Sequence, residues 1–340
     1  MLARSSTLLH RTSGVKFPTP LLVPSFSSKG FKTSDNPGHS ETSKILTTTA
    51  EFLTQYYLVS AYDIYYGHIP EPSELPFKPE LIFVDSGGYE VSDEYDFSVV
   101  SNGHHPVHEW NVELLRKVLD AWPDSMPAVL VSYDNPKNRK PFLDQVHDAR
   151  ALFSGRTGHL HTFLIKPEKK DQTTLENALK AVMANTDELS SFDIIGVTEK
   201  ELGHSMLDRM AHIAKLRLRL TDAGINSPIH VFGALDPLSV CLYFISGAEI
   251  FDGLTWIRYG YSEGRCVYPH NFGVIEYGIQ ARDDFSKSRM MVNNYYYLDN
   301  LQLKMQEFVS TGDFSKLAPH SELIRNAIDS LNTRLHGGAK

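Results

Sequence analysis

The sequence has few cysteines and no long apolar run, and both absences limit what the chain can be. Only Cys241 and Cys266 occur among 340 residues, too few for a disulfide framework or for a four-ligand zinc cluster built on cysteines. No run of 18 apolar residues is present, so the sequence predicts no transmembrane helix and no membrane partner. These features are typical of a reducing compartment, and we expect a cytoplasmic protein.

The chain also has little basic character. Its formal net charge is −8, with 33 lysines and arginines against 41 aspartates and glutamates. Domains that hold nucleic acid by their overall charge are usually basic, so a nucleic-acid contact here would need a local basic patch. The segment before Asp35 lacks acidic residues, as organelle transit peptides do, but it leads directly into a strand-like stretch, which argues against such a leader.

Short apolar runs alternate with longer amphipathic segments from Leu21 onward. A weaker run at residues 290–292 precedes a helix expected over about residues 294–310. Eight strands separated by helices predict the α/β class and a (β/α)8 TIM barrel, in one domain over residues 1–330 with a tail over 331–340. The seven clearer runs, each predicted as a buried strand, are residues 21–26, 81–84, 128–133, 162–165, 194–197, 230–233 and 249–254.

Three of the predicted strands end in aspartate, at Asp85, Asp134 and Asp252. Aspartate before Ser-Gly or Asn-Pro is also ordinary turn chemistry, in which the carboxylate caps backbone N–H groups. In a (β/α)8 barrel, however, the C-terminal strand ends form the active face, so these three carboxylates would face one another across it. Paired carboxylates suit glycosidic chemistry, with one as nucleophile and one as proton shuttle.

Further short motifs occur in order along the same strands. With the clearest of them, Asp85-Ser86-Gly87-Gly88-Tyr89, the chain resembles the tRNA-guanine transglycosylases, which exchange guanine in a polynucleotide for a 7-deazaguanine through a covalent glycosyl-enzyme intermediate. The resemblance spans most of the chain and implies a hairpin before the first strand. The other motifs are Ser13-Gly14-Val15 with Thr19-Pro20, Ile195-Gly196-Val197 with Glu201, His230-Val231-Phe232-Gly233 with Pro237, Gly247-Ala248-Glu249-Ile250-Phe251-Asp252, and Gly312-Asp313-Phe314.

The resemblance implies a role for each matching residue. Asp252 would be the nucleophile at the ribose anomeric carbon, and Asp85 the general acid and base. Asp134 would read the Watson–Crick edge of guanine, which presents N–H donors to a carboxylate. No cofactor is implied, and the 7-deazaguanine base is the co-substrate. The remaining base-binding residues would be the backbone of Gly196 and Val197, the aromatic rings of Tyr89 and Phe232, and the side chains of Ser86 and Glu201.

The sequence departs from the family after the nucleophile strand. Family members hold a structural zinc there with three cysteines and a histidine, whereas this chain offers Cys266 with His270 nearby, so we expect no metal and a reduced insertion after the seventh strand. Tyr261 stands where the family has a second arginine. A basic rim remains beyond the strand ends, and its residues expected to bind phosphate are Arg258, Lys166, Lys137 and Arg139.

Three interpretations stay open. The chain is an active guanine transglycosylase acting on tRNA or DNA, a non-catalytic or partner-dependent subunit of such an enzyme, or an unrelated barrel hydrolase that uses a metal. The last would draw on His104, His105 and His108, the one dense histidine group. A homodimer or a partner protein is possible for either of the first two.

Overall fold

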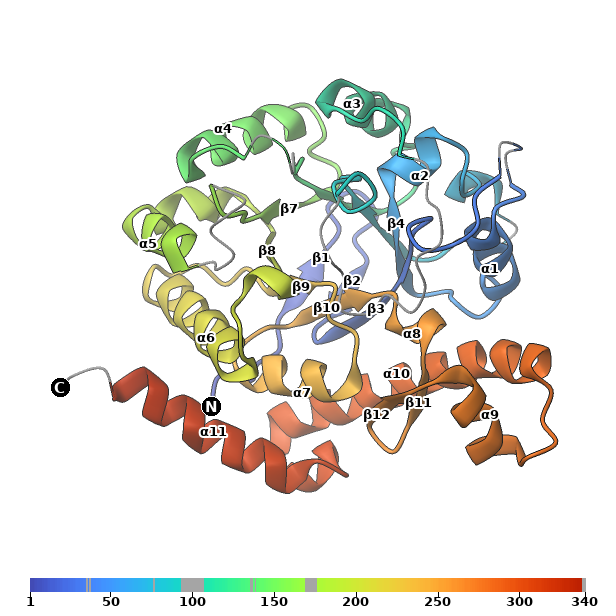
Figure 1. Ribbon diagram of the computed structural model, residues 1–340. Coiled ribbons are helices and arrows are strands. Elements are labelled where there is room, and N and C mark those ends of the chain that lie inside the picture. Colours follow the sequence, from blue (N-terminus) through green and yellow to red (C-terminus); the bar gives the residue numbers. More distant parts are fainter. Residues whose placement is uncertain are drawn as a thin grey trace.

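The structure is a closed barrel of eight parallel strands surrounded by helices, which confirms the predicted α/β (β/α)8 architecture (Figure 1). The computed structural model describes residues 1–34, 36, 38–75, 77–92, 107–134, 137, 139–168 and 176–337. The strands pair in the order β10-β3-β4-β5-β6-β7-β8-β9. They are β3 (Leu21–Phe26), β4 (Tyr56–Ser60), β5 (Leu81–Asp85), β6 (Ala128–Val131), β7 (Leu160–Leu164), β8 (Ile194–Thr198), β9 (Ile229–Phe232) and β10 (Ile250–Gly253).

The weak eighth strand was predicted in the wrong place. Residues 290–292 lie inside the long helix α10 (Asp283–Thr311), whose buried residues Met290, Asn294 and Leu298 recur at helical spacing. The missing strand is β4, which pairs in parallel with β3 and β5. All five residues of β4 are buried, as are those of β3, β6 and β9, so it has the pattern of a strand buried on both faces.

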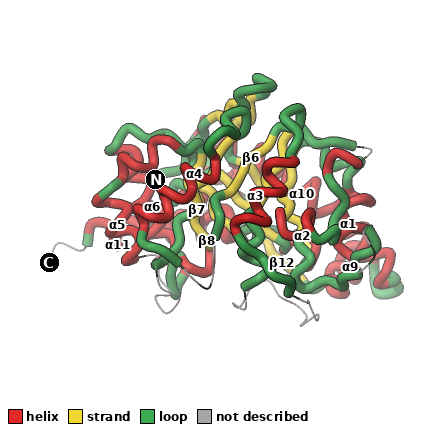
Figure 2. The backbone as a smooth tube through the Cα atoms, turned by 90° about the horizontal axis from the view of Figure 1, so that it is seen from above, coloured by secondary structure: helices red, strands yellow, loops and turns green. Residues whose placement is uncertain are grey.

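Helices cover the outside of the barrel, and Figure 2 shows the strands in the middle with helices to both sides. Alternate strand residues divide between two cores. Tyr57, Val59 and Val84 pack outward against the helices, whereas Leu58 and Phe83 fill the barrel. The helices are α1 (Glu41–Thr49), α2 (Ala61–Tyr65), α3 (Val112–Ala121), α4 (Phe142–Phe153), α5 (Glu176–Ala184), α6 (Met206–Asp222), α7 (Pro237–Ile245), α8 (Thr255–Arg258), α9 (Pro269–Tyr277), α10 and α11 (Ser321–His336).

The expected N-terminal hairpin is present and lies at the N-terminal end of the barrel. Strands β1 (Thr7–Leu9) and β2 (Lys16–Pro18) pair antiparallel, and Leu8 and Phe17 belong to the core inside the barrel. Glu249 sits fully buried beside them, where it accepts hydrogen bonds from the hydroxyls of Ser6 and Thr19 at 2.6 Å each. This end of the barrel is therefore closed, and the opposite end is left for a site.

The insertion predicted after the seventh strand follows β10, which is the eighth strand once β4 is counted. It consists of α8, a short hairpin of β11 (Gly260–Ser262) and β12 (Arg265–Val267), and α9, and it lies beside the barrel in Figure 1. At the other end of the chain, α11 runs to His336 with Leu331 buried, so the expected boundary at residue 330 falls inside a helix. No helix among the described residues is long and apolar enough to cross a membrane.

Candidate active site

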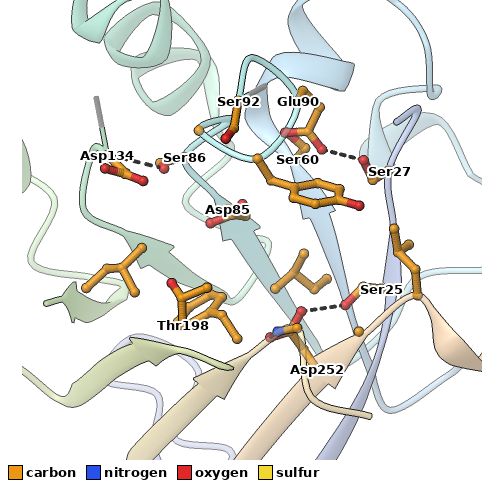
Figure 3. Close-up of a pocket in the computed structure, with 18 of the residues that line it drawn as sticks. Ser25, Ser27, Ser60, Asp85, Ser86, Glu90, Ser92, Asp134, Thr198 and Asp252 are labelled. Carbon is orange, nitrogen blue, oxygen red and sulfur yellow. Dashed lines mark hydrogen bonds between the residues drawn. The ribbon is translucent and has the colours of Figure 1, made fainter. Parts of the chain in front are cut away.

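A pocket opens at the C-terminal ends of the barrel strands, with about 970 Å³ of space including its mouth (Figure 3). Its floor is built mainly by inward-facing residues at the strand ends, because the period of two that points Leu58 and Phe83 into the barrel also points Ser60 and Asp85 there. Strand-end residues that line the pocket are Ser25, Ser60, Asp85, Lys166, Thr198, Phe232 and Asp252.

Asp252, the predicted nucleophile, is 5% exposed and held at both oxygens. Its Oδ2 accepts a hydrogen bond from Ser25 Oγ at 2.8 Å, and its Oδ1 lies 2.9 Å from His230 Nε2. The backbone N–H of Gly233 also donates to Oδ1, at 3.3 Å. Donors from β3, from β9 and from the turn after β9 therefore fix the carboxylate at the edge of the pocket.

Asp85, the predicted acid and base, lies at the end of β5, and β3 and β4 separate it from Asp252. Burial raises the pKa of Asp85 to about 8, with further contributions from the nearby carboxylates of Glu90 and Asp252. A carboxyl with this pKa carries a proton at neutral pH, which is the state a general acid needs.

Glu90 forms a third carboxyl at the pocket. Its side chain is buried, and its two oxygens accept hydrogen bonds from Ser27 Oγ at 2.5 Å and from Ser60 Oγ at 2.7 Å. Figure 3 shows the Ser27 contact. Burial raises the pKa of Glu90, although the two hydroxyls oppose the shift. Glu90 thus ties together the ends of β3 and β4 and raises the pKa of Asp85.

Asp134 lies in a group of four buried charges, two of each sign. Lys166 Nζ is 3.1 Å from Asp134 Oδ2 and 3.2 Å from Glu201 Oε2, and it donates to Thr198 Oγ1 at 2.8 Å. Arg139 approaches both carboxylates, at 3.6 Å from Asp134 and 2.8 Å from Glu201. The four charges balance in pairs, which offsets the cost of burying each of them.

These ion pairs give Lys166 and Arg139 a role at the site. Burial alone would lower the pKa of Lys166, but Asp134 and Glu201 outweigh it and the net shift is upward. The ammonium remains charged, because it donates to Thr198 and lies within ion-pair distance of both carboxylates. Lys166 and Arg139 therefore orient the carboxylates of Asp134 and Glu201.

The two aromatic residues predicted to hold a flat base both line the pocket. Phe232 stacks on His230 with ring centroids 3.8 Å apart. Tyr89 lies under Lys29, whose Nζ is 4.5 Å from the ring centre, and its hydroxyl accepts a bond from Arg258 at 3.4 Å. Both rings are thus held in place by neighbours, as a stacking platform requires.

Gly196 and Val197 lie deeper than predicted. They pair with β9 inside β8, and the pocket surface beyond them is formed by Thr198, Glu199 and Lys200. A side chain at Gly196 would come within 2.8 Å of Phe232, so this glycine makes room for the aromatic ring.

Ser86 is buried beside the Asp134 group, and its Oγ accepts the backbone N–H of Asp134 at 3.4 Å. Its carbonyl accepts a bond from Trp110 Nε1 at 2.8 Å. The glycine that follows, Gly87, has a φ of +86°, and a Cβ there would lie 2.5 Å from Trp110. The motif thus bends the chain around Trp110 immediately after Asp85.

The remaining predicted phosphate-binding residues lie in different surroundings. Arg258 is 8% exposed, donates to the carbonyl of Lys29 at 2.9 Å and lies over the ring of Phe31. It holds the loop after β3 against Tyr89 and presents little surface to a polymer. Lys137 is exposed.

The histidine group considered for metal chemistry is only partly described. His108 stacks on Tyr66 with centroids 4.6 Å apart, while His104 and His105 lie outside the described residues. No group of three or more His, Cys, Asp or Glu side chains in the described ranges is arranged to hold a metal ion. Burial raises the pKa of the Cys266 thiol, and His270 stacks on Tyr268.

Sequence reasoning missed Ser25, His230 and Glu90. Ser25 is a polar residue in an otherwise buried apolar strand, and His230 precedes Phe232 by two positions and so shares its face. Both features could have been recognised in the sequence. Nothing in the sequence marks Glu90 as buried, because its partners Ser27 and Ser60 come from other strands.

No protein-family model matches the sequence, and no curated protein matches it.

Proposed function

We propose that the protein is a base-exchange transglycosylase, which replaces guanine in tRNA or DNA with a 7-deazaguanine through a covalent glycosyl ester on Asp252. The observation that carries the proposal is the pair of unlike carboxyls in one pocket. Asp252 is fixed by three donors, whereas Asp85 stands apart in surroundings that favour its protonated form. This division suits one nucleophile and one general acid.

In the first half-reaction, an oxygen of Asp252 forms a bond to the anomeric carbon as the bond from that carbon to guanine breaks. The electron pair of the broken bond leaves with guanine, and the proton on Asp85 moves to the departing base. In the second half, the incoming 7-deazaguanine gives its proton to Asp85 and attacks the same carbon, which releases Asp252. Two inversions restore the original configuration.

The pocket walls support this scheme. Tyr89 and Phe232 offer aromatic surface for a flat base, and Leu58, Leu164 and Leu254 add apolar surface that would limit the access of water to the ester. Asp134 faces the pocket with its carboxylate oriented by Lys166. An ionised carboxylate has about four acceptor sites, so the ion pair leaves room for N–H groups of a base.

The direct test is incorporation of radiolabelled guanine into bulk tRNA and into double-stranded DNA, offered in parallel to the purified protein. We expect label in one polymer, retained by the exposed control Asp222→Asn and lost with Asp252→Asn. A covalent adduct should survive denaturation in the wild type and be absent from Asp252→Asn. Label in neither polymer would contradict the proposal and favour a partner-dependent or non-catalytic subunit, and full exchange by Asp252→Asn would contradict the assigned nucleophile.

A further inference from the structure

His230 lies entirely inside the barrel, directly below the pocket. It is 0% exposed, with its ring against the face of Phe232 and near the edge of Phe83, at a centroid distance of 5.6 Å. Nε2 points to Asp252 Oδ1 at 2.9 Å. A buried imidazole needs a partner for its polar atoms, and Asp252 supplies one.

The position of the ring proton follows from these surroundings. An ionised carboxylate can only accept hydrogen bonds, so Nε2 of His230 carries the hydrogen that reaches Asp252. Nδ1 has no hydrogen-bond partner among the described residues, and a proton there would be a buried N–H without an acceptor. In this arrangement His230 donates to Asp252 through Nε2.

The two oxygens of Asp252 differ in how firmly they are held. Oδ1 accepts two N–H groups, from His230 and from the backbone of Gly233, and neither can turn away. Oδ2 accepts the hydroxyl of Ser25, which can rotate about its C–O bond. Oδ2 can therefore give up its hydrogen bond and form a new covalent bond, whereas Oδ1 stays fixed.

We propose that His230 is a positioning residue that directs Oδ2 of Asp252 to the anomeric carbon and favours its later release. This inference rests on the proposed function. As the bond from Oδ2 to carbon forms, Oδ1 becomes the carbonyl oxygen of the ester and keeps both N–H donors. When the incoming base attacks, the electron pair of that bond returns to Asp252, and the two N–H groups again stabilise a full carboxylate.

The donors bind the free carboxylate more tightly than the ester, because hydrogen bonds to an ionised acceptor are about twice as strong as those between neutral groups. Loss of the His230 donor should therefore shift the balance between free enzyme and covalent adduct toward the adduct. We expect a shift of about tenfold, which corresponds to the difference between a charged and a neutral hydrogen bond.

Two substitutions separate this role from a packing role. His230→Phe keeps an aromatic ring against Phe232 but removes the donor. His230→Gln loses the ring but retains an N–H group at nearly the same reach. The readout is the ratio of adduct to free enzyme in a denaturing gel, with polymer and labelled guanine at fixed concentrations. His230→Phe should raise this ratio about tenfold and slow exchange, and His230→Gln should restore values near those of the wild type.

A packing role gives the opposite order, with His230→Phe similar to the wild type and His230→Gln impaired, and that result would overturn the proposal. A second measurement does not depend on either variant being active. The ¹⁵N spectrum of histidine-labelled wild type should show His230 protonated at Nε2 alone, with a signal that shifts in Asp252→Ala. A proton on Nδ1 would overturn the proposal. Failure of the wild type to exchange any base would instead overturn the proposed function.

Discussion

The raised pKa of Asp85 makes a prediction about stability as well as about chemistry. The pKa of this carboxyl is raised from 3.8 to about 8 in the folded protein, first by burial and then by Glu90 and Asp252. Between these two values the folded chain holds a proton that the unfolded chain releases. Stability must therefore fall as pH rises through this range, and the loss is complete above about pH 8.

The substitution Asp85→Asn removes this titration and nearly preserves the shape of the side chain. Each pH unit between the two pKa values is worth about 1.4 kcal/mol, so the wild type should lose roughly 4 kcal/mol between pH 5 and pH 8 that the variant does not lose. Relative to the wild type, Asp85→Asn should become progressively more stable as pH rises. The same variant should lose base exchange, because an amide cannot give up or regain the proton.

Urea unfolding at pH 5, 6.5 and 8 measures the effect through the transition midpoint at constant slope. Asp222→Asn, an exposed substitution at the end of α6, is the matched control and should follow the wild type at every pH. If wild type and Asp85→Asn lose stability in parallel from pH 5 to pH 8, then Asp85 is already ionised at pH 5. The reasoning that makes it a general acid would then be refuted.

Three other substitutions follow from contacts at the site. Asp134→Ala should lower the free energy of unfolding by about 3–5 kcal/mol, because it removes one of the two buried carboxylates that face Lys166, and urea unfolding measures this loss. The same variant should weaken the selection of guanine over adenine, which a competition between the two bases would show. Gly196→Ala should displace Phe232, lower stability by about 1–3 kcal/mol and raise KM for the base, which steady-state kinetics would show. Arg258→Met should free the loop after β3 and lower kcat/KM, while the salt dependence of polymer binding stays that of the wild type; a smaller salt slope would mean that Arg258 contacts phosphate.

The barrel could be predicted because its strands are short apolar runs with longer helical segments between them, and this pattern is local. One strand of the barrel, β4, was not predicted. Strand β4 is buried along its whole length like β3, β6 and β9, and its short run was passed over, while Met290 begins an apolar run that looks like a strand until its neighbours at helical spacing are considered. The strand-end aspartates were equally local signals, and Asp85, Asp134 and Asp252 all line one pocket.

The charge pairing could not be predicted, because it joins residues from separate strands. Lys166 follows β7, Glu201 follows β8 and Asp134 follows β6, and the parallel pairing of these three neighbouring strands brings the Lys166 ammonium within 3.2 Å of both carboxylates. A lysine just beyond a strand end suggests a basic rim when the sequence is read one segment at a time. Whether that lysine turns inward depends on the acids contributed by its neighbours.

The carboxyls at the pocket thus lie in two different electrostatic environments. On one side, Asp134 faces Lys166 and Arg139, so its charge is balanced by cations that are themselves buried. On the other side, Asp85 and Glu90 lie in surroundings that raise both pKa values. A carboxyl that must only accept hydrogen bonds gains from fixed cations, whereas one that must exchange a proton requires that they be distant. Lys166 follows β7, two strands from Asp85 on β5, and its charge opposes the rise in the pKa of Asp85 without cancelling it.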